Sequence, residues 1–209
     1  MKRYVTELIG TFFLVFAIGL SSGPMAPLAI GSMLMVMLYM GGHVSGAHYN
    51  PAVTLGVLLR GAMQKADAVP YVLAQLLGAT LAAVSVAVIT GQTFAPVPGA
   101  GVAAHAALLG EVLVTFALVL VVLNVATAKS TAGNSYFGLA IGFTVLAGAY
   151  TVGPISGGAF NPAVGIGPTL VHTLAGDGSF ASLWLYIVGP LLGGLAAVPV
   201  FMMQTAAEK

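Results

Sequence analysis

The 209-residue chain contains no cysteine and very little charge. Six Lys/Arg and five Asp/Glu make up only 5% of the sequence, whereas soluble domains average about 25% charged residues. The missing cysteine excludes a disulfide scaffold, and a hydrophobic content of 59% excludes a disordered chain. A soluble globule would need a polar coat that this composition cannot supply. Because the net charge is only +1, nucleic-acid binding is also disfavoured. The composition therefore predicts an integral membrane protein.

In place of charge, the chain has long apolar stretches. A membrane-spanning helix needs about 20 apolar residues, and hydropathy indicates six such spans. They lie at 4–22, 27–44, 68–90, 105–127, 135–152 and 182–204. Two further apolar pieces, at 50–60 and 161–171, are too short to cross a bilayer and are interpreted as re-entrant half-helices. The predicted fold is an all-α membrane protein with six transmembrane helices and two half-helices.

The six basic residues give an independent test of this topology. With six spans they all fall on one side of the membrane, at Lys2, Arg3, Arg60, Lys65, Lys129 and Lys209. The opposite loops, around 23–27, 91–104 and 172–181, contain no Lys or Arg. By the positive-inside rule, both termini are predicted to be cytoplasmic. We expect a multi-pass protein of the cell membrane, such as a bacterial inner membrane.

The two halves of the chain repeat each other. Glu7-Leu-Ile-Gly-Thr11-Phe12 resembles Glu111-Val-Leu-Val-Thr115-Phe116, and residues 44–56 resemble residues 155–167. Each half contains three spans, an odd number, so the second half must enter the membrane from the opposite side. We therefore expect one domain, 1–209, made of inverted repeats at about 1–100 and 101–209.

Each half-helix is predicted to begin at an Asn-Pro-Ala motif. Asparagine is a favoured N-cap and proline suits the first helical turn, so each helix directs its positive dipole end at the bilayer centre. The glycine-rich runs 45–49 and 156–160 before the motifs are irregular backbone, which membranes tolerate only when it is buried or lines a water-filled cavity. We expect a pore in which the asparagine amides donate and backbone carbonyls accept hydrogen bonds, and from which the dipole ends repel cations. The candidate carbonyls belong to Gly46, Ala47, His48, Gly157 and Ala159.

These motifs resemble the aquaporin (major intrinsic protein) family. Residues 48–56, His-Tyr-Asn-Pro-Ala-Val-Thr-Leu-Gly, match the family signature, and residues 160–163, Phe-Asn-Pro-Ala, match its second copy. The corresponding pore motif residues are Asn50, Pro51, Ala52, Asn161, Pro162 and Ala163. The resemblance covers essentially the whole chain. It implies six spans, two half-helices, one pore per protomer and usually a homotetramer.

The resemblance also implies roles for several polar side chains. Glu7 and Glu111 are expected to brace the re-entrant loops, the alternative being that both reach the interface to contact water. His48 resembles a position that packs the loop and contributes a backbone carbonyl, and His43 either lines the cytoplasmic mouth or is structural. No cysteine–histidine cluster, Ser/His/Asp grouping or phosphate loop is found. We expect no enzyme activity, no cofactor and no metal.

The sequence departs from the family pattern at the outer selectivity filter. Most members follow the second Asn-Pro-Ala with arginine, whereas this chain has Val164. Counting from the motifs, the other filter positions fall on Ile30, Ala149 and Gly158, which supply neither charge nor an aromatic ring. Loss of arginine removes a fixed cation and a fork of donors, so a wide, apolar constriction is predicted. Two alternatives are that Tyr150 or Phe160 refills the gap, or that the alignment slips by one residue.

The sequence favours a passive channel for water and small uncharged solutes such as glycerol, urea or metalloid and arsenical species. A narrow water-selective channel with a rebuilt filter is the first alternative. An inverted-repeat secondary transporter is a weaker one, because it would need coupling carboxylates near the midplane and only Glu7 and Glu111 are available. A structural junction protein is disfavoured because the loops are too short to form an adhesive surface.

Overall fold

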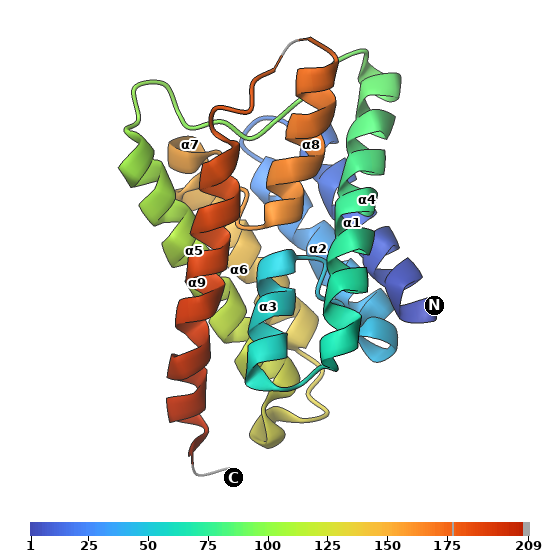
Figure 1. Cartoon of the computed structure of the whole chain (residues 1–209), viewed down its shortest axis with the longest axis vertical. Helices are drawn as coiled ribbons and strands as arrows, with labels where there is room; N and C mark the ends of the chain where they lie inside the picture. Colours follow the sequence, from blue (N-terminus) through green and yellow to red (C-terminus); the bar gives the residue numbers. More distant parts are fainter. Residues whose placement is uncertain (177, 207–209) are drawn as a thin grey trace.

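The computed structural model describes residues 1–176 and 178–206, and the regular elements in these ranges are all helical (Figure 1). The long helices are α1 (Lys2–Leu20), α2 (Ala26–Ser45), α4 (Lys65–Thr90), α5 (Ala104–Thr127), α6 (Phe137–Thr151) and α9 (Leu183–Gln204). The shorter elements are α3 (Pro51–Arg60), the 3₁₀ turn η1 (Lys129–Thr131), α7 (Gly153–Ser156) and α8 (Pro162–Leu174). Lys209, one of the six cations used for the topology, lies outside the described residues.

Five of the predicted spans are helices long and apolar enough to cross a membrane. The exception is the predicted span at 135–152, which is the 15-residue helix α6 followed directly by the short helix α7. The long helix stops at Thr151 because Pro154 has no N–H with which to continue the hydrogen-bond ladder, and a separate short helix with this proline in its first turn begins at Gly153. The fifth apolar stretch is therefore shorter as a continuous helix than predicted.

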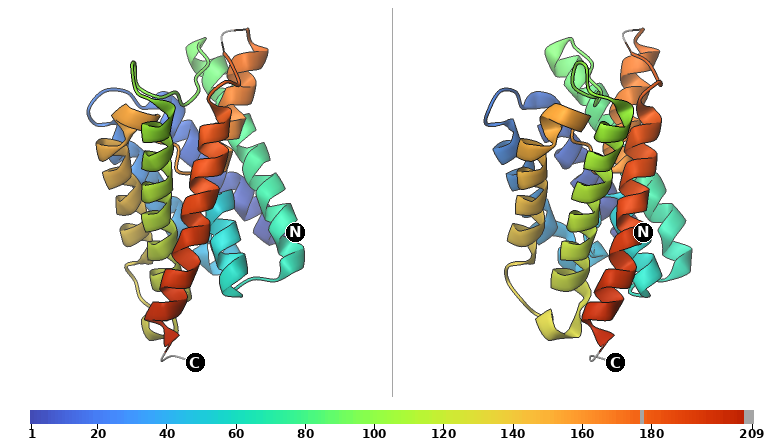
Figure 2. Two further views of the ribbon diagram at one scale, coloured as in Figure 1. Left: turned by 60° about the vertical axis from the view of Figure 1, so that its left-hand side comes forward. Right: turned by 90° about the vertical axis from the view of Figure 1, so that its left-hand side faces the viewer.

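The two halves of the chain have the same order of elements around a shared axis. In the first half α1 packs on α4, and in the second half α5 packs on α9, while α2 packs on α6 between the halves. The half-helix α3 rises from the lower end of the molecule and α8 descends from the upper end, so that their N-termini meet at mid-height (Figures 1 and 2). This arrangement matches the predicted inverted repeat of three helices and one half-helix.

Glycines let the equivalent helix pairs approach closely. A Cβ atom at Gly78 of α4 would lie 2.3 Å from the backbone oxygen of Leu8 in α1. In the second half, a Cβ at Gly193 of α9 would lie 2.4 Å from the backbone oxygen of Val112 in α5. Small residues that bring backbones together are typical of membrane helix interfaces, where packing drives association.

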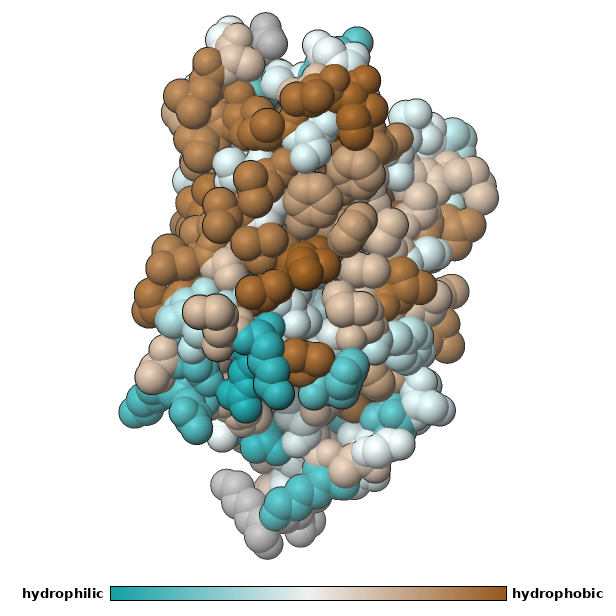
Figure 3. Space-filling model, turned by 90° about the vertical axis from the view of Figure 1, so that its right-hand side faces the viewer, coloured by the Kyte–Doolittle hydropathy of each residue, from teal (hydrophilic) through white to brown (hydrophobic). Residues whose placement is uncertain are grey.

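The surface of the bundle is apolar over most of its height. Figure 3 shows one face on which hydrophobic side chains cover the middle and upper parts and polar side chains gather toward the lower end. Val69, Leu73 and Val88 of α4 are 66%, 60% and 80% exposed. Where α1 and α4 begin, Arg3 pairs with Asp67 at 3.2 Å. An apolar belt above a charged end is the surface expected of a chain embedded in lipid.

Candidate functional site

The two asparagines cap the half-helices. Asn50 has extended backbone, and its side-chain oxygen accepts a hydrogen bond from the Ala52 amide at 2.8 Å. Asn161 does the same for the Ala163 amide at 2.9 Å. The predicted N-caps are therefore confirmed. Both helix N-termini, which carry positive partial charge, face each other at the middle of the bundle.

The same asparagines also join the two halves. The Asn50 side-chain nitrogen donates to the carbonyl of Phe160, and the Asn161 nitrogen donates to the carbonyl of Tyr49, both at 2.8 Å. An amide nitrogen has two hydrogens, so each asparagine keeps one that this cross-link does not use. The sequence prediction assigned the amide hydrogens of both asparagines to the solute alone. In the structure, one hydrogen of each amide instead bonds to the opposite loop.

The loops before the half-helices have left-handed backbone that non-glycine residues rarely adopt. Ala47, Tyr49 and Phe160 have φ angles of 51°, 50° and 50°. In the second loop, Gly157 and Gly158 have φ angles of 94° and 67°. Such conformations persist only where the surroundings hold them, so the hydrogen-bond partners of these loops decide whether the carbonyls stay in place.

Glu7 holds the first loop from the fully buried face of α1. One carboxyl oxygen accepts from the Ser45 hydroxyl at 2.7 Å and from the His48 amide at 3.0 Å. The other accepts from the Tyr49 amide at 2.7 Å and from the Gln75 side chain at 2.8 Å. The carboxyl group is thus used in full by the loop and by α4, and none of its oxygens reaches the membrane interface.

Glu111 holds the second loop in the same way from α5. It accepts from the Ser156 hydroxyl at 2.6 Å, from the Ala159 amide at 3.0 Å and from the Phe160 amide at 2.7 Å. Gln75 has no polar equivalent here. It lies four residues after Tyr71 on α4, and the residue four after the matching Tyr186 on α9 is Pro190. The second carboxyl group therefore depends more completely on its loop.

Two tyrosines that sequence reasoning missed complete the supports. Tyr71 donates to the Ser45 carbonyl at 2.6 Å, and Tyr186 donates to the Ser156 carbonyl at 2.5 Å. Gln75 was missed as well, and its nitrogen also contacts the hydroxyl of Thr54 at 3.0 Å. The available signal was the i, i+4 spacing of Tyr71 and Gln75, which puts two polar groups on one face of an otherwise apolar span.

A cavity of about 200 Å³, the upper cavity, passes the half-helix N-termini; most of its lining lies above them, and Leu38, Val53 and Val122 line its lower part. All four sequence-predicted filter residues line it: Ile30 from α2, Ala149 from α6, Gly158 from the second loop and Val164 from α8. Among the described residues, no charged side chain lines this cavity. Its polar lining comes from the loops and from the two asparagines.

The two residues considered as replacements for the filter arginine lie differently. Tyr150 is 46% exposed on the outer surface, and its neighbour Ala149 takes the cavity-lining position. Phe160 lines the upper cavity and is buried with its ring against α6, where a Cβ at Gly148 would lie 3.1 Å from the ring. Of the two aromatic residues, Phe160 therefore reaches the cavity lining and Tyr150 does not.

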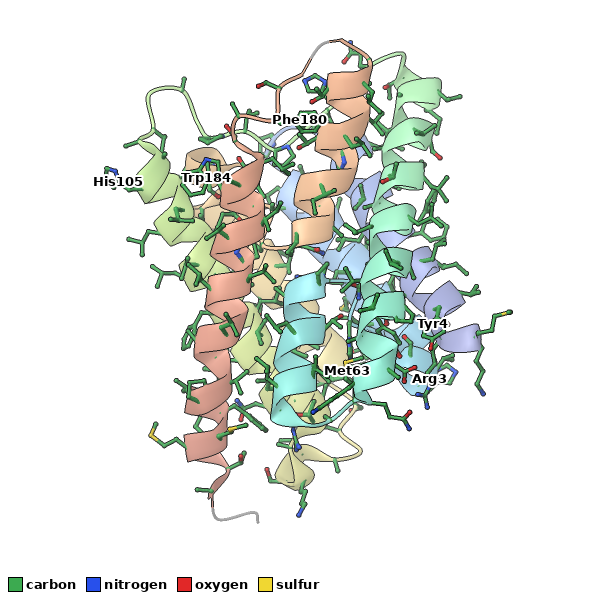
Figure 4. All side chains as sticks on the ribbon, in the orientation of Figure 1. Arg3, Tyr4, Met63, His105, Phe180 and Trp184 are labelled. Carbon is green, nitrogen blue, oxygen red and sulfur yellow. The ribbon has the colours of Figure 1, made fainter. Side chains whose placement is uncertain are left out.

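A second, more polar cavity of about 470 Å³ lies at the lower end. It is lined by Arg3, His43, Arg60 and Met63, and it shares His48 and Val122 with the upper cavity. Figure 4 shows Arg3, Tyr4 and Met63 at this end, while His105, Phe180 and Trp184 lie at the other. Of the predicted carbonyl positions, Gly46 lines the lower cavity, Ala47, Gly157 and Ala159 line the upper one, and His48 lines both.

The bundle, the paired half-helices and two adjoining axial cavities define the chain as a polytopic membrane protein of the channel class. The sequence pattern of the family described as "Major intrinsic protein" matches residues 1–201. The chain therefore belongs to the major intrinsic protein family, a family of membrane channels.

Individual relatives agree with this assignment. Aquaporin NIP1-1 of Zea mays is 37% identical over 94% of this chain and 72% of its own length. Glycerol uptake facilitator protein-like 6 of Lactiplantibacillus plantarum is 35% identical over 94% of this chain and 95% of its own length. The X-ray structure of the aquaglyceroporin from Plasmodium falciparum superposes with a TM-score of 0.85 at 23% identity, covering 96% of this chain and 94% of that one. This last likeness concerns the fold.

Proposed function

We propose that this protein is a passive channel for water and small uncharged solutes, with a wide and uncharged selectivity filter. The observation that carries the proposal is that Ile30, Ala149, Gly158 and Val164 all line the upper cavity. Pore diameter and lining donors decide which solutes pass, and these four residues include two very small ones and no fixed cation. Glycerol, urea and neutral metalloid or arsenical hydroxides fit these properties, and the name of one relative refers to glycerol uptake.

The remaining site roles follow from the same geometry. We assign solute contact to the second hydrogens of Asn50 and Asn161 and to the loop carbonyls. Exclusion of cations rests on the facing N-termini of α3 and α8, because positive dipole ends repel them. Glu7 and Glu111 act as supports, since their oxygens are occupied by hydrogen bonds from the loops. This occupation also argues against the secondary transporter, which would need a carboxyl group free to bind the coupling ion.

The proposal includes the setting of the channel. The five described cations lie at the end where α1 begins, where α3 meets α4 and where η1 follows α5, so we infer that this end and both termini are cytoplasmic. We propose that residues 1–209 form one channel domain in a cell membrane and assemble as a homotetramer. The exposed apolar helix faces allow such an assembly.

The test is solute flux through proteoliposomes, measured by stopped-flow light scattering with water, glycerol, urea and arsenite gradients. Wild type is expected to pass all four. Val164→Arg is expected to reduce glycerol, urea and arsenite flux by about tenfold or more, equivalent to a barrier raised by about 1.4 kcal/mol, and water flux far less. Val164→Met is the matched control, because it lengthens the side chain without adding charge or donors.

Two outcomes would contradict the proposal. If wild type passes only water and Val164→Arg behaves identically, the filter is narrow for another reason. If flux depends steeply on a proton or sodium gradient, the protein is a transporter.

A further inference from the structure

An apolar groove of about 490 Å³ lies on the outside of the two half-helices, away from the pore. It is formed by α3, α4, α8 and α9, and its lining includes Pro51, Leu58, Leu73, Pro162, Ile166 and Leu191. It shares no lining residue with the upper or lower cavity of the pore. In Figure 1 these four helices form the front of the molecule, and no other described segment crosses α3 there. The groove therefore opens sideways, toward the surroundings of the bundle.

The groove is about as long as one lipid leaflet is thick. Its lining runs along α3 from Leu58, near the lower end, to Pro51, where the half-helices meet, and continues along α8 from Pro162 to Ile166. At 1.5 Å per residue these two stretches rise about 10 Å and about 6 Å, and the hydrocarbon of one leaflet is about half of 30 Å. At the rim, Val69 and Leu73 are 66% and 60% exposed. A groove of this length and lining suits a single extended hydrocarbon chain.

The lower end of the groove is positively charged. Lys65, the first residue of α4, is exposed and lies one helical turn before Val69 of the groove lining. Arg60, the last residue of α3, faces the lower pore cavity, where its guanidinium donates to Thr127 of α5, so of these two described residues the free charge is that of Lys65. The nearby acid Asp67 is already engaged by Arg3 at 3.2 Å and by the Tyr4 hydroxyl at 2.7 Å. Basic residues beside a membrane attract anionic headgroups. The charge at this end therefore complements a lipid phosphate.

We propose that the groove binds one acyl chain of an anionic phospholipid from the leaflet on the Arg60 side, with the headgroup beside Lys65. The bound chain packs against Pro51 and Pro162, on the outer side of the two half-helices whose asparagines cross-link inside the pore. The lipid thus fills the space behind the central constriction. This site is independent of which solute the channel carries.

The test is quenching of a tryptophan reporter by brominated acyl chains in vesicles. The chain has one tryptophan, Trp184, so Trp184→Phe gives a silent background. Leu73→Trp in that background places the reporter at the groove rim. Leu192→Trp, 47% exposed and turned about 100° around α9 from the groove residue Leu191, is the matched control. Each is reconstituted with brominated phosphatidylglycerol or brominated phosphatidylcholine as a minor component at equal mole fraction.

Quenching of the groove reporter is expected to show phosphatidylglycerol enriched about fivefold over phosphatidylcholine. One basic residue near the membrane surface contributes about 1 kcal/mol, which corresponds to this ratio. The control reporter is expected to be quenched equally by both lipids. Lys65→Gln is expected to lower the enrichment, whereas Lys129→Gln, which removes a charge at the same end away from the groove, leaves it unchanged. Equal quenching of the groove reporter by both lipids would overturn the proposal. So would an absence of quenching, which means that protein covers the groove, or an enrichment that survives Lys65→Gln.

Discussion

At the scale of single residues, the two buried glutamates have equivalent positions and unequal surroundings. Glu7 has Gln75 as a neighbour, and the Gln75 side-chain oxygen is buried without a hydrogen-bond partner. Glu111 has no such neighbour on α9. Its oxygens accept from a hydroxyl and from backbone amides. None of these partners is a side-chain amide that could rotate to offer an oxygen in place of its nitrogen. The two supports should therefore differ in their tolerance of change.

We predict that Glu111→Gln destabilises the protein more than Glu7→Gln. Each change replaces one carboxyl oxygen by an NH₂ group opposite a loop amide and leaves that buried amide unpaired, a loss of about 2 kcal/mol. In Glu7→Gln, rotation of the Gln75 amide can present its unused oxygen to the new NH₂ group and recover part of the loss. The measurement is the denaturation midpoint of the purified protein in detergent, followed by circular dichroism.

The double change Glu7→Gln with Gln75→Ala is the control for this compensation. In a Gln75→Ala background, Glu7→Gln should lower the denaturation midpoint by as much as Glu111→Gln lowers that of the wild type. Equal midpoints for the two single glutamine variants would show that the rotation does not occur.

At the scale of elements, the half-helices were the most predictable part of the chain. Asn-Pro starts both, and α3 ends at Arg60 as predicted. Helix α8 continues to Leu174, three residues beyond the predicted end, because the first left-handed glycine after it is Gly176. The spacing of Tyr71 and Gln75 marked a polar face on α4, but the partners of Tyr71, Gln75 and Tyr186 were not predictable, since they lie 21 to 68 residues away and are met only in the folded chain.

We predict that Gly78→Ala weakens the α1–α4 pair. The added Cβ would lie 2.3 Å from the Leu8 carbonyl oxygen, and a backbone atom cannot move aside without separating the helices. Overpacking of this kind typically costs about 1–3 kcal/mol. The denaturation midpoint of Gly78→Ala should fall accordingly. Its flux of the solutes that wild type passes should fall in proportion to the folded fraction.

Gly153→Ala is the comparison, because a Cβ there meets no atom within 4 Å. It should change stability by no more than about 0.5 kcal/mol. A Gly78→Ala protein as stable as Gly153→Ala would mean that α1 and α4 separate without loss.

At the scale of the whole molecule, the sparse charge and the inverted repeat make one prediction about orientation. The loop between α4 and α5 contains no Lys or Arg, whereas η1 contains Lys129. Since the chain has no cysteine, single cysteines can be introduced without background. In intact cells, a membrane-impermeant maleimide should label Gln92→Cys, and it should label Ser130→Cys only after the cells are permeabilised. The reverse pattern would place the termini outside.

The crossed asparagine bonds have a consequence for the order of synthesis. When the first half has entered the membrane, the Asn50 amide and the Tyr49 carbonyl have no partner, because both partners belong to a loop more than 100 residues further along the chain. Unpaired polar groups at this depth are costly in hydrocarbon. We therefore expect the first re-entrant segment to reach its final depth only after the second half is made, because Asn50 and Tyr49 gain these partners only then.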